Sequence, residues 1–279
     1  MTDSRLGWAV PLMRVGYAGK GLVYLAVAGV SLRSIWRGGE AQDTSSAFGW
    51  LNATPWGAVV LFVILAGMVA YAVWRVLDAA FDLEDYGSAA KGIVARLGML
   101  VTGAIHLGIA VVVFPLLFRW GDAGEGEGIA DYVGTVMAWP GGRWIIGAVA
   151  LLIIGAGLHY ARQGWTGAYR DDLRANHFTT RWNPVLKAGL IAHGAVVGVI
   201  GLLFLFAGWR ADPDKAGGTG DAFSWLSDQV YGQILVTGIC LGLLGFALFC
   251  FVNAAYRIVP KVSGPDVRSL AASLTGGRL

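Results

Sequence analysis

The sequence predicts an all-α, polytopic membrane protein with six transmembrane helices, arranged as three tandem helical hairpins in a pseudo-threefold arrangement. Three observations predict this fold: an apolar composition, tryptophans gathered at the ends of the apolar stretches, and a hairpin pattern that occurs three times. Of the 279 residues, 56% are hydrophobic and 14% are charged, and the mean hydropathy is +0.61. Soluble domains carry about 25% charged residues, so this balance indicates lipid as the solvent.

Six stretches are apolar enough to cross a bilayer as helices, which takes about 20 residues each. Five of them contain no Asp, Glu, Lys or Arg, and the first contains only Lys20. Cys240 and Cys250 both fall in the last stretch, ten positions apart, so a disulfide between them is geometrically excluded. The six stretches are 15–32, 55–74, 97–118, 144–161, 188–209 and 230–256.

The tryptophans and the basic residues predict how the chain sits in the membrane. All twelve tryptophans lie near an end of an apolar stretch, as in the aromatic belts of membrane proteins. Fourteen Lys and Arg residues lie in the N-terminal segment, the second and fourth loops and the tail, against six in the other three loops. By the positive-inside rule, both termini of this multi-pass protein are expected on the cytoplasmic side of the cell membrane. The net charge of +3 reflects this topology, and no nucleic-acid partner is expected.

The first helix of each hairpin has the same glycine pattern. Counted from Arg14, Arg96 and Lys187, glycine stands two residues on and again seven residues on. The pattern predicts three tandem repeats at 12–82, 93–172 and 186–259, followed by a cytoplasmic tail at 260–279 that is expected to be disordered. Because each repeat has two spans, successive repeats enter the membrane in the same direction, which predicts a threefold axis along the membrane normal.

A short segment precedes the second helix of each hairpin. It reads AFGWL at 47–51 and AFSWL at 222–226. Ala47, Trp50 and Leu51 fall on one helical face, so we expect a short amphipathic helix in each outer loop, with its Trp among the lipid headgroups. The middle repeat reads YVGTV at this place, which predicts a weaker interfacial helix.

These motifs resemble one family. The pattern R-x-G-(x4)-G, the Trp-Arg pair that ends each first helix, the A-x-x-W-L and P-x-G segments, and AYAVWRVLDAA at 70–80 are similar to a bacterial membrane family catalogued as domain of unknown function 1206. The resemblance covers nearly the whole chain. It implies six helices in three pairs, and it implies no activity, substrate or cofactor.

Each hairpin carries a polar residue at two equivalent depths. Polar side chains are costly within lipid, so such positions predict a function. A threefold arrangement would bring them together in a polar layer in the inner leaflet, with Lys20 and Asp78 paired, as a site for a small solute or ion. Alternatively, they form hydrogen bonds between helices or reach the headgroups. They are Lys20, Thr102 and His193 on the first helices, and Asp78, Gln163 and Asn253 on the second helices.

Three histidines also lie in the predicted helices. Paired transmembrane histidines can ligate haem or a metal ion. His106 lies near the middle of the third helix, and His159 and His193 lie at similar depth in the fourth and fifth helices. Histidine is equally common in hydrogen bonds between helices, and no further ligand recurs at a fixed spacing. A haem-binding redox subunit is therefore kept as one alternative function, with no metal site and no other cofactor expected.

The leading hypothesis is a non-enzymatic membrane protein that binds or conducts a small solute or ion. The sequence contains no Ser–His–Asp, HExxH or paired-cysteine signature, so we expect no enzymatic activity. The other alternative is a structural or partner-binding subunit that docks through its outer loops. The G-x-x-x-G segments at 194–198 and 238–242 favour tight packing within one subunit or, alternatively, a homo-oligomer contact in the bilayer.

Overall fold

Six long helices carry the six apolar stretches, and all are long and apolar enough to cross a membrane. This computed structural model describes residues 7–118, 129–262 and 267–275. The all-α prediction is confirmed within these ranges. The long helices are α1 (Ala9–Trp36), α3 (Gly57–Phe81), α4 (Ala90–Phe118), α6 (Gly142–Thr166), α7 (His177–Arg210) and α9 (Gly232–Tyr256).

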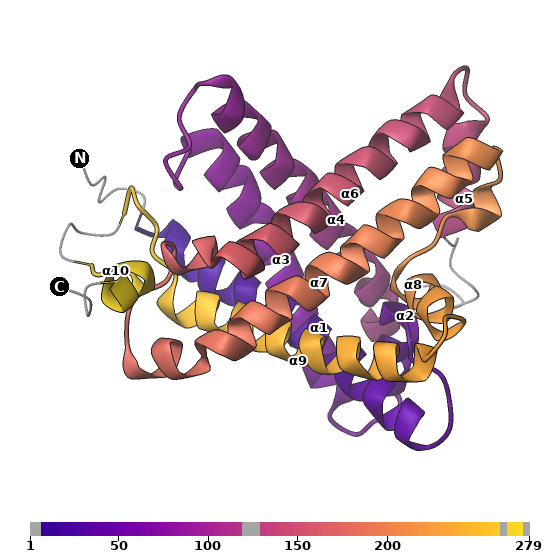
Figure 1. Ribbon diagram of the computed structural model, residues 1–279, viewed down its shortest axis with the longest axis horizontal. Coiled ribbons are helices and arrows are strands. Elements are labelled where there is room, and N and C mark those ends of the chain that lie inside the picture. The colour runs from indigo at the N-terminus through magenta and orange to yellow at the C-terminus, as the bar shows by residue number, and fades with distance from the viewer. Residues whose placement is uncertain (1–6, 119–128, 263–266, 276–279) are drawn as a thin grey trace.

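A short helix of nine residues joins the two long helices of every hairpin. These are α2 (Thr44–Asn52), α5 (Ile129–Met137) and α8 (Thr219–Ser227). They gather at one end of the molecule, the loop-helix end, whereas the start of α1 and the short α10 (Leu270–Thr275) lie at the opposite, terminal end (Figure 1). Three tandem hairpins are therefore present.

The short helices α2 and α8 turn their apolar side chains inward and their tryptophans outward. Ala47 and Phe48 of α2 are buried, whereas Trp50 is 41% exposed. The middle short helix, predicted to be weaker, has the same length as the other two, but it buries one residue where α2 buries two and α8 buries three. Val133 of α5 is buried against Ile146 and Ala207, so these contacts replace the Phe anchor of the other repeats.

The glycine that begins the second long helix is required for the same structural reason in all three hairpins. A Cβ atom added at Gly57 would lie 1.5 Å from the carbonyl oxygen of Leu51 in the preceding short helix. At Gly142 and Gly232 the corresponding distance is 2.0 Å. Only glycine allows the short helix to fold back so closely onto the start of the next long helix.

The long helices pack in the cyclic order that a pseudo-threefold arrangement requires, with one departure. Extensive contacts join α1 with α3 and α9, α3 with α4, α6 with α7, and α7 with α9. Within the described residues, α4 and α6 share no comparable contact. The α3–α4 and α6–α7 pairs run along opposite diagonals in Figure 1. As a result, α4 and α6 are the least buried of the six long helices.

Glycines produce the tightest helix contacts, as the G-x-x-x-G pattern predicts for packing within one subunit. Gly194 of α7 faces the backbone of Gly157 and Ala161 in α6, and a Cβ at Gly157 would lie 2.7 Å from the nitrogen of Gly198. Gly242 of α9 approaches Ala192 of α7 in the same way. In lipid, such close backbone approach replaces the hydrophobic drive between helices.

The tail is predicted to be disordered at 260–279, but its residues 267–275 pack against the protein, while 263–266 and 276–279 lie outside the described residues. The backbone nitrogen of Leu270 donates to the carbonyl of Leu173 at 2.7 Å, and that of Ala175 donates to the carbonyl of Arg268 at 3.0 Å. The Leu270 side chain is completely buried. Backbone pairing with the α6–α7 loop and this one apolar anchor hold the segment in place.

Candidate functional site

The interior divides into two zones along the membrane normal. Toward the loop-helix end, the core is apolar and contains Val27, Phe48, Ile64, Val113 and Phe223, among others. Toward the terminal end, the interior holds buried ionisable residues from several helices. They include Lys20, Asp78, His106 and His193, each at most 5% exposed. This asymmetry places the candidate site in the terminal half.

Lys20 lies at the centre of the site, between aromatic rings from all three repeats. Its Nζ lies 5.1 Å from the ring centre of Tyr71 in α3, 5.4 Å from Phe246 in α9 and 5.9 Å from Tyr160 in α6. The neighbouring Gly19 and Gly21 allow α3 and α9 to approach α1 closely at this level. Cation–π contacts of this kind stabilise a desolvated ammonium group by about 2 kcal/mol or more each.

Each long helix contributes one ring to the surroundings of Lys20, and we call the lysine and these rings the Lys20 cage. His193 stacks on Phe246 with a centroid distance of 3.8 Å and lies 4.7 Å from Tyr160. On the opposite side, His106 lies 4.5 Å from Tyr71. The rings are Tyr24 (α1), Tyr71 (α3), His106 (α4), Tyr160 (α6), His193 (α7) and Phe246 (α9).

Three buried groups in the cage have unused hydrogen-bonding or charge capacity. None of the ion pairs among the described residues includes Lys20. Nε2 of His106 and Nδ1 of His193 are buried and have no hydrogen-bond partner. Native proteins rarely leave such groups unsatisfied, and where they do, a ligand, an ion or a water molecule is the usual explanation.

The predicted pair of Lys20 with Asp78 is wrong. Asp78 Oδ2 instead lies 3.0 Å from Arg75 Nη1, three residues earlier on the same helix, where the side chains of a helix meet. Arg75 also donates to the hydroxyl oxygens of Tyr71 at 3.1 Å and Tyr17 at 3.2 Å. Tyr71 thus links the Lys20 cage to a charged layer nearer the terminal end.

Arg257 closes the terminal end by contacting all three repeats. Its guanidinium donates to Glu84 Oε1 from both Nε and Nη2, and Nη1 donates to Asn253 Oδ1 at 2.8 Å. The same group lies 3.8 Å from Asp172 and over the ring of Tyr17. We call Arg257, Glu84, Asp172, Asn253 and Tyr17 the arginine latch. Its members come from α1, α9 and the two loops at the terminal end.

The electrostatic state of Glu84 follows from its two arginine neighbours. Burial alone would raise the pKa of the Glu84 carboxyl, but the charges of Arg257 and Arg75 outweigh burial and hold this pKa below its usual range. Stability gained from the ionised form is therefore present above the ordinary glutamate pKa, and it is lost as the pH falls through the lower, folded-state pKa.

We expect Glu84→Gln to lower the unfolding temperature more at about pH 7 than at about pH 3, because the native protein loses the stabilising charge of this carboxyl as the pH falls through its lowered pKa. Breaking one partner of a buried pair costs about 3–5 kcal/mol, so the effect at neutral pH is measurable by thermal unfolding in detergent. Asp85→Asn is the control in the same loop, because no ion pair among the described residues includes Asp85. An equal loss in both buffers contradicts the assignment.

The six residues of the predicted polar layer are divided among three environments. Lys20 and His193 lie in the Lys20 cage. Asp78 and Asn253 lie in the charged layer below it, where Arg75 and Arg257 bind them. Thr102 and Gln163 are only half-buried, and the Thr102 hydroxyl donates to Gly98 of its own helix. The helices of the second hairpin are separated, which keeps these two side chains out of a common layer.

Sequence reasoning missed the aromatic and arginine members of the site. Tyr71 and Phe246 stand fourteen residues after Gly57 and Gly232, so the repeat alignment contained a signal for them. Arg75 lies within AYAVWRVLDAA, three residues before Asp78. Glu84 and Arg257 lie outside the spans, and nothing in the sequence indicated that they would meet.

The two histidines of similar depth in the haem hypothesis, His159 and His193, lie in different environments. His159 is exposed on the surface of α6, whereas His193 is buried in the cage. The described residues contain no group of three or more His, Cys, Asp or Glu side chains that is suited to a metal ion. His106 and His193 are buried, but aromatic rings contact both of them.

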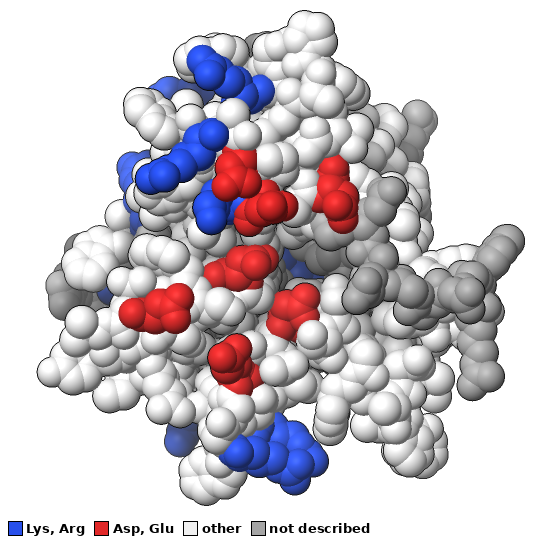
Figure 2. Space-filling model, turned by 90° about the vertical axis from the view of Figure 1, so that its right-hand side faces the viewer, with Lys and Arg blue, Asp and Glu red and all other residues white. Residues whose placement is uncertain are grey.

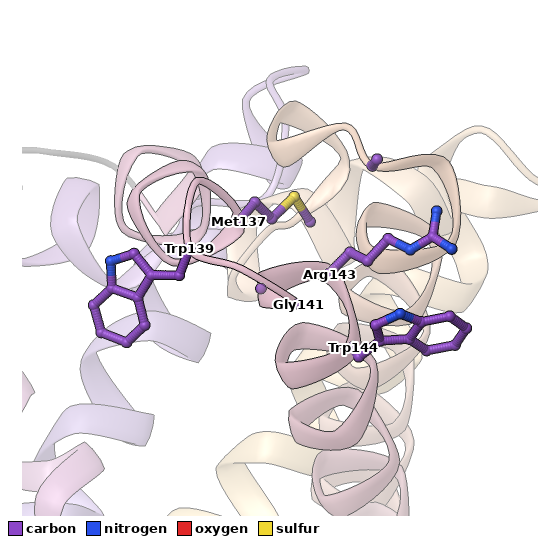
Figure 3. Close-up of a pocket in the computed structure, with 7 residues that line it drawn as sticks. Met137, Trp139, Gly141, Arg143 and Trp144 are labelled. Carbon is purple, nitrogen blue, oxygen red and sulfur yellow. The ribbon is translucent and has the colours of Figure 1, made fainter.

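Two surface pockets lie away from the Lys20 cage. One, of about 320 Å³, lies at the start of α6 and is lined by Met137, Trp139, Arg143 and Trp144, among others (Figure 3). The Arg143 guanidinium lies 4.8 Å from the Trp144 ring. The other, of about 290 Å³, lies between α3 and α4 beside Arg96. Arginine next to tryptophan is typical of the headgroup zone, and neither pocket contacts a residue of the cage.

The loop-helix end carries a cluster of acidic side chains. Figure 2 views the molecule from this end and shows Asp and Glu near the middle of the face, with Lys and Arg toward its edge. The acidic residues of the described outer loops are Glu40, Asp43, Asp131, Asp212, Asp214, Asp221 and Asp228. Asp43 and Asp221 have local structural roles, since each accepts a backbone hydrogen bond at the start of a short helix.

The fold and the site together define a multi-pass helical membrane protein, built from three tandem hairpins around a buried lysine. The chain belongs to the family described as Domain of Unknown Function (DUF1206), whose model matches residues 15–82, 97–167 and 188–257, one segment for each hairpin. It is also similar to a protein of Bacillus subtilis (strain 168) named "Uncharacterized protein YxxB", with 26% identity over 254 residues, which cover 90% of this chain and 92% of that protein. No solved structure matches the chain.

Proposed function

We propose that this protein binds a small anion at Lys20 and takes it from the cytoplasmic side of the cell membrane, as a non-enzymatic solute-binding or transport protein. The cytoplasmic assignment of the terminal end rests on the excess of Lys and Arg at that end. The single observation that carries the proposal is the buried ammonium group of Lys20, which aromatic rings surround and which forms no ion pair with a carboxylate of the described residues.

Electrostatics favours an anion as the ligand. Removing an ammonium group from water costs several kcal/mol even after local relaxation, and cation–π contacts stabilise the group without neutralising its charge. The nearest carboxylate of a spanning helix, Asp78, already binds Arg75. An anion seated beside Nζ would supply the missing opposite charge, and aromatic faces would cover its apolar part.

The distribution of polar and apolar side chains supports access from the terminal end. On the other side of Lys20, the apolar core and the buried Phe48 and Phe223 of the short helices close the interior. On the terminal side, hydrogen bonds and ion pairs of the arginine latch separate the cage from water. Polar contacts between loops rearrange more readily than close-packed apolar helices, so the latch is the favoured entrance.

A stability measurement separates this proposal from a purely structural role of Lys20. A residue whose only role is to form hydrogen bonds between helices stabilises the fold, so its removal lowers the unfolding temperature. A buried charge without a counter-ion does the opposite. We expect Lys20→Met to raise the unfolding temperature of the purified protein in a buffer of bulky, excluded anions, by an amount equivalent to about 1–4 kcal/mol.

The same variant tests binding directly. We expect the sodium salts of acetate, glycolate, nitrate, chloride or phosphate, compared at equal ionic strength, to include at least one that raises the unfolding temperature of the native protein saturably. Lys20→Met should remove this response, and Lys91→Met, at an exposed site on α4, should keep it. A fall in the unfolding temperature of Lys20→Met, with no saturable anion response in the native protein, would contradict the proposal.

A further inference from the structure

We infer that the anion held by Lys20 carries a hydrogen-bond donor of its own, as a small hydroxycarboxylate does, and that Nε2 of His106 accepts from this donor. The inference rests on the proposed function and names its substrate class. It is drawn from the hydrogen bonds of the two buried histidines, which are independent of the lysine's charge.

The hydrogen bond at Nδ1 of His106 determines whether Nε2 donates or accepts a hydrogen bond. Nδ1 of His106 lies 2.7 Å from the carbonyl oxygen of Thr102, one turn earlier on α4. A carbonyl oxygen only accepts hydrogen bonds, so Nδ1 must donate and carries the proton. In the neutral imidazole, Nε2 is then a lone-pair acceptor, and it needs a donor from its surroundings.

The unsatisfied Nε2 belongs to the same cage as Lys20. His106 is 5% exposed, and Nε2, on the side of the ring away from its hydrogen-bonded nitrogen, is buried without a partner. Tyr71 contacts both residues. Its ring centre lies 4.5 Å from the centre of the His106 imidazole and 5.1 Å from Lys20 Nζ. Lys20 is close enough for its charge to act on His106 and on His193.

His193, in the third hairpin, supplies a second buried nitrogen without a partner. It stands six residues after Lys187, as Lys20 stands six residues after Arg14, so the two residues occupy equivalent positions. Its Nδ1 is also buried without a partner. A ligand in the cage therefore meets one cationic donor and two imidazole nitrogens, all at least nine-tenths buried.

These groups exclude most simple ligand classes. A plain carboxylate satisfies Lys20 and leaves the Nε2 acceptor of His106 empty. An amine or metal cation is repelled by Lys20, and a neutral alcohol leaves the ammonium charge uncompensated. A small hydroxycarboxylate satisfies both demands, because its carboxylate accepts from Lys20 and its hydroxyl donates to His106.

Glycolate and acetate form the matched probe pair, because they share a carboxylate and differ by one hydroxyl. We expect the native, full-length protein in detergent to bind glycolate about tenfold or more tightly than acetate, by thermal-shift titration with the sodium salts. A hydroxyl that pairs with a buried acceptor gives discrimination of this size or greater.

Two substitutions at one position test the assigned acceptor. His106→Leu removes the nitrogen and should bring the glycolate-to-acetate ratio to about one while acetate binding remains. His106→Gln places an amide oxygen near the same point and should keep the preference. His177→Leu, at an exposed site at the start of α7, is the control and should leave the ratio unchanged.

Each outcome has one reading. Equal binding of glycolate and acetate by the native protein overturns this inference and leaves anion binding at Lys20 intact, with a water molecule as the donor to His106. A preference for glycolate that survives in His106→Leu overturns the role of His106. If neither anion binds and no other anion does, the proposed function itself fails. If acetate binds more tightly, the substrate class is wrong.

Discussion

Replacing Arg257 with Met will open the terminal end of the protein and expose Cys250 to water-soluble thiol reagents. Arg257 binds Glu84 and Asn253 and lies near Asp172, so one side chain joins the α3–α4 loop, the α6–α7 loop and α9. Methionine retains an unbranched apolar stem and removes every one of these polar contacts. The carboxylate of Glu84 then loses its main partner in a buried place, which costs about 3–5 kcal/mol and favours a hydrated, open arrangement.

The two native cysteines provide matched reporters on one helix. Cys250 is fully buried in the terminal half, in a cluster with Leu173, Leu186 and Phe246. Cys240 is equally buried in the apolar core nearer the loop-helix end. With Cys240→Ala as background, a charged methanethiosulfonate should label Cys250 at least about tenfold faster in Arg257→Met than in the parent, because an opened latch admits water. With Cys250→Ala as background, Cys240 should remain protected.

The labelling rates of the two cysteines distinguish a local opening of the arginine latch from a general loosening of the bundle. Faster labelling at both positions would mean that Arg257→Met loosens the whole bundle, and the latch would then be an ordinary stabilising contact. Unchanged labelling at Cys250 would mean that the terminal end is closed by apolar packing alone. Exchanging the charges, with Arg257→Glu and Glu84→Arg together, should restore part of the protection that either single change removes.

The second large effect is expected from Gly189→Ala, which should prevent α7 and α9 from packing and should abolish the Lys20 cage. A Cβ at Gly189 would lie 2.3 Å from the backbone nitrogen of Phe246 and 2.4 Å from the carbonyl carbon of Gly245. Backbone atoms cannot rotate away as a side chain does, so the helices must separate. Overpacking costs about 1–3 kcal/mol in ordinary cores and more where only backbone can move.

The control for this change lies nine residues later on the same helix. A Cβ at Gly198 would meet no atom within 4 Å, so Gly198→Ala should be nearly neutral. We expect Gly189→Ala to lower the unfolding temperature and the yield of folded protein in detergent, with Gly198→Ala close to the native protein in both. Because Phe246 stacks on His193, the anion response should also disappear in Gly189→Ala. Equal stability of the two variants would show that α7 and α9 are not in close contact.

The sequence predicted the architecture well because the features that specify it are local and repeated. A helix must be long and apolar to cross lipid, and its backbone must satisfy its own hydrogen bonds, so spans are visible along the chain. The glycines at the start of each second helix recur for the same reason in every repeat, since a carbonyl oxygen of the preceding short helix approaches them. Of the glycines two residues after Arg14, Arg96 and Lys187, Gly16 and Gly189 meet the backbone of another helix, whereas a Cβ at Gly98 would meet no atom within 4 Å. The burial of Lys20 and His193 also followed from the equivalence of the repeats.

Tertiary structure decided which of the polar residues meet, and the repeat alone was a poor guide to this. An ideal threefold arrangement places Thr102 and Gln163 beside Lys20, but α4 and α6 do not pack against each other in the described residues, so both side chains stay outside. The partner of Asp78 is Arg75 rather than Lys20, because a neighbour one turn away on the same helix is always within reach.

By itself, the sequence determined that this chain folds as three hairpins of membrane-spanning helices, since hydropathy and close-packing glycines act through neighbouring residues. Only the tertiary structure decided that Lys20 lies among aromatic rings with no ion pair to any described residue, and that Arg257 joins two loops and α9. Such contacts depend on where residues from different repeats converge. That convergence follows from the packing of all the helices together, and one departure from symmetry at α4 and α6 is enough to change it.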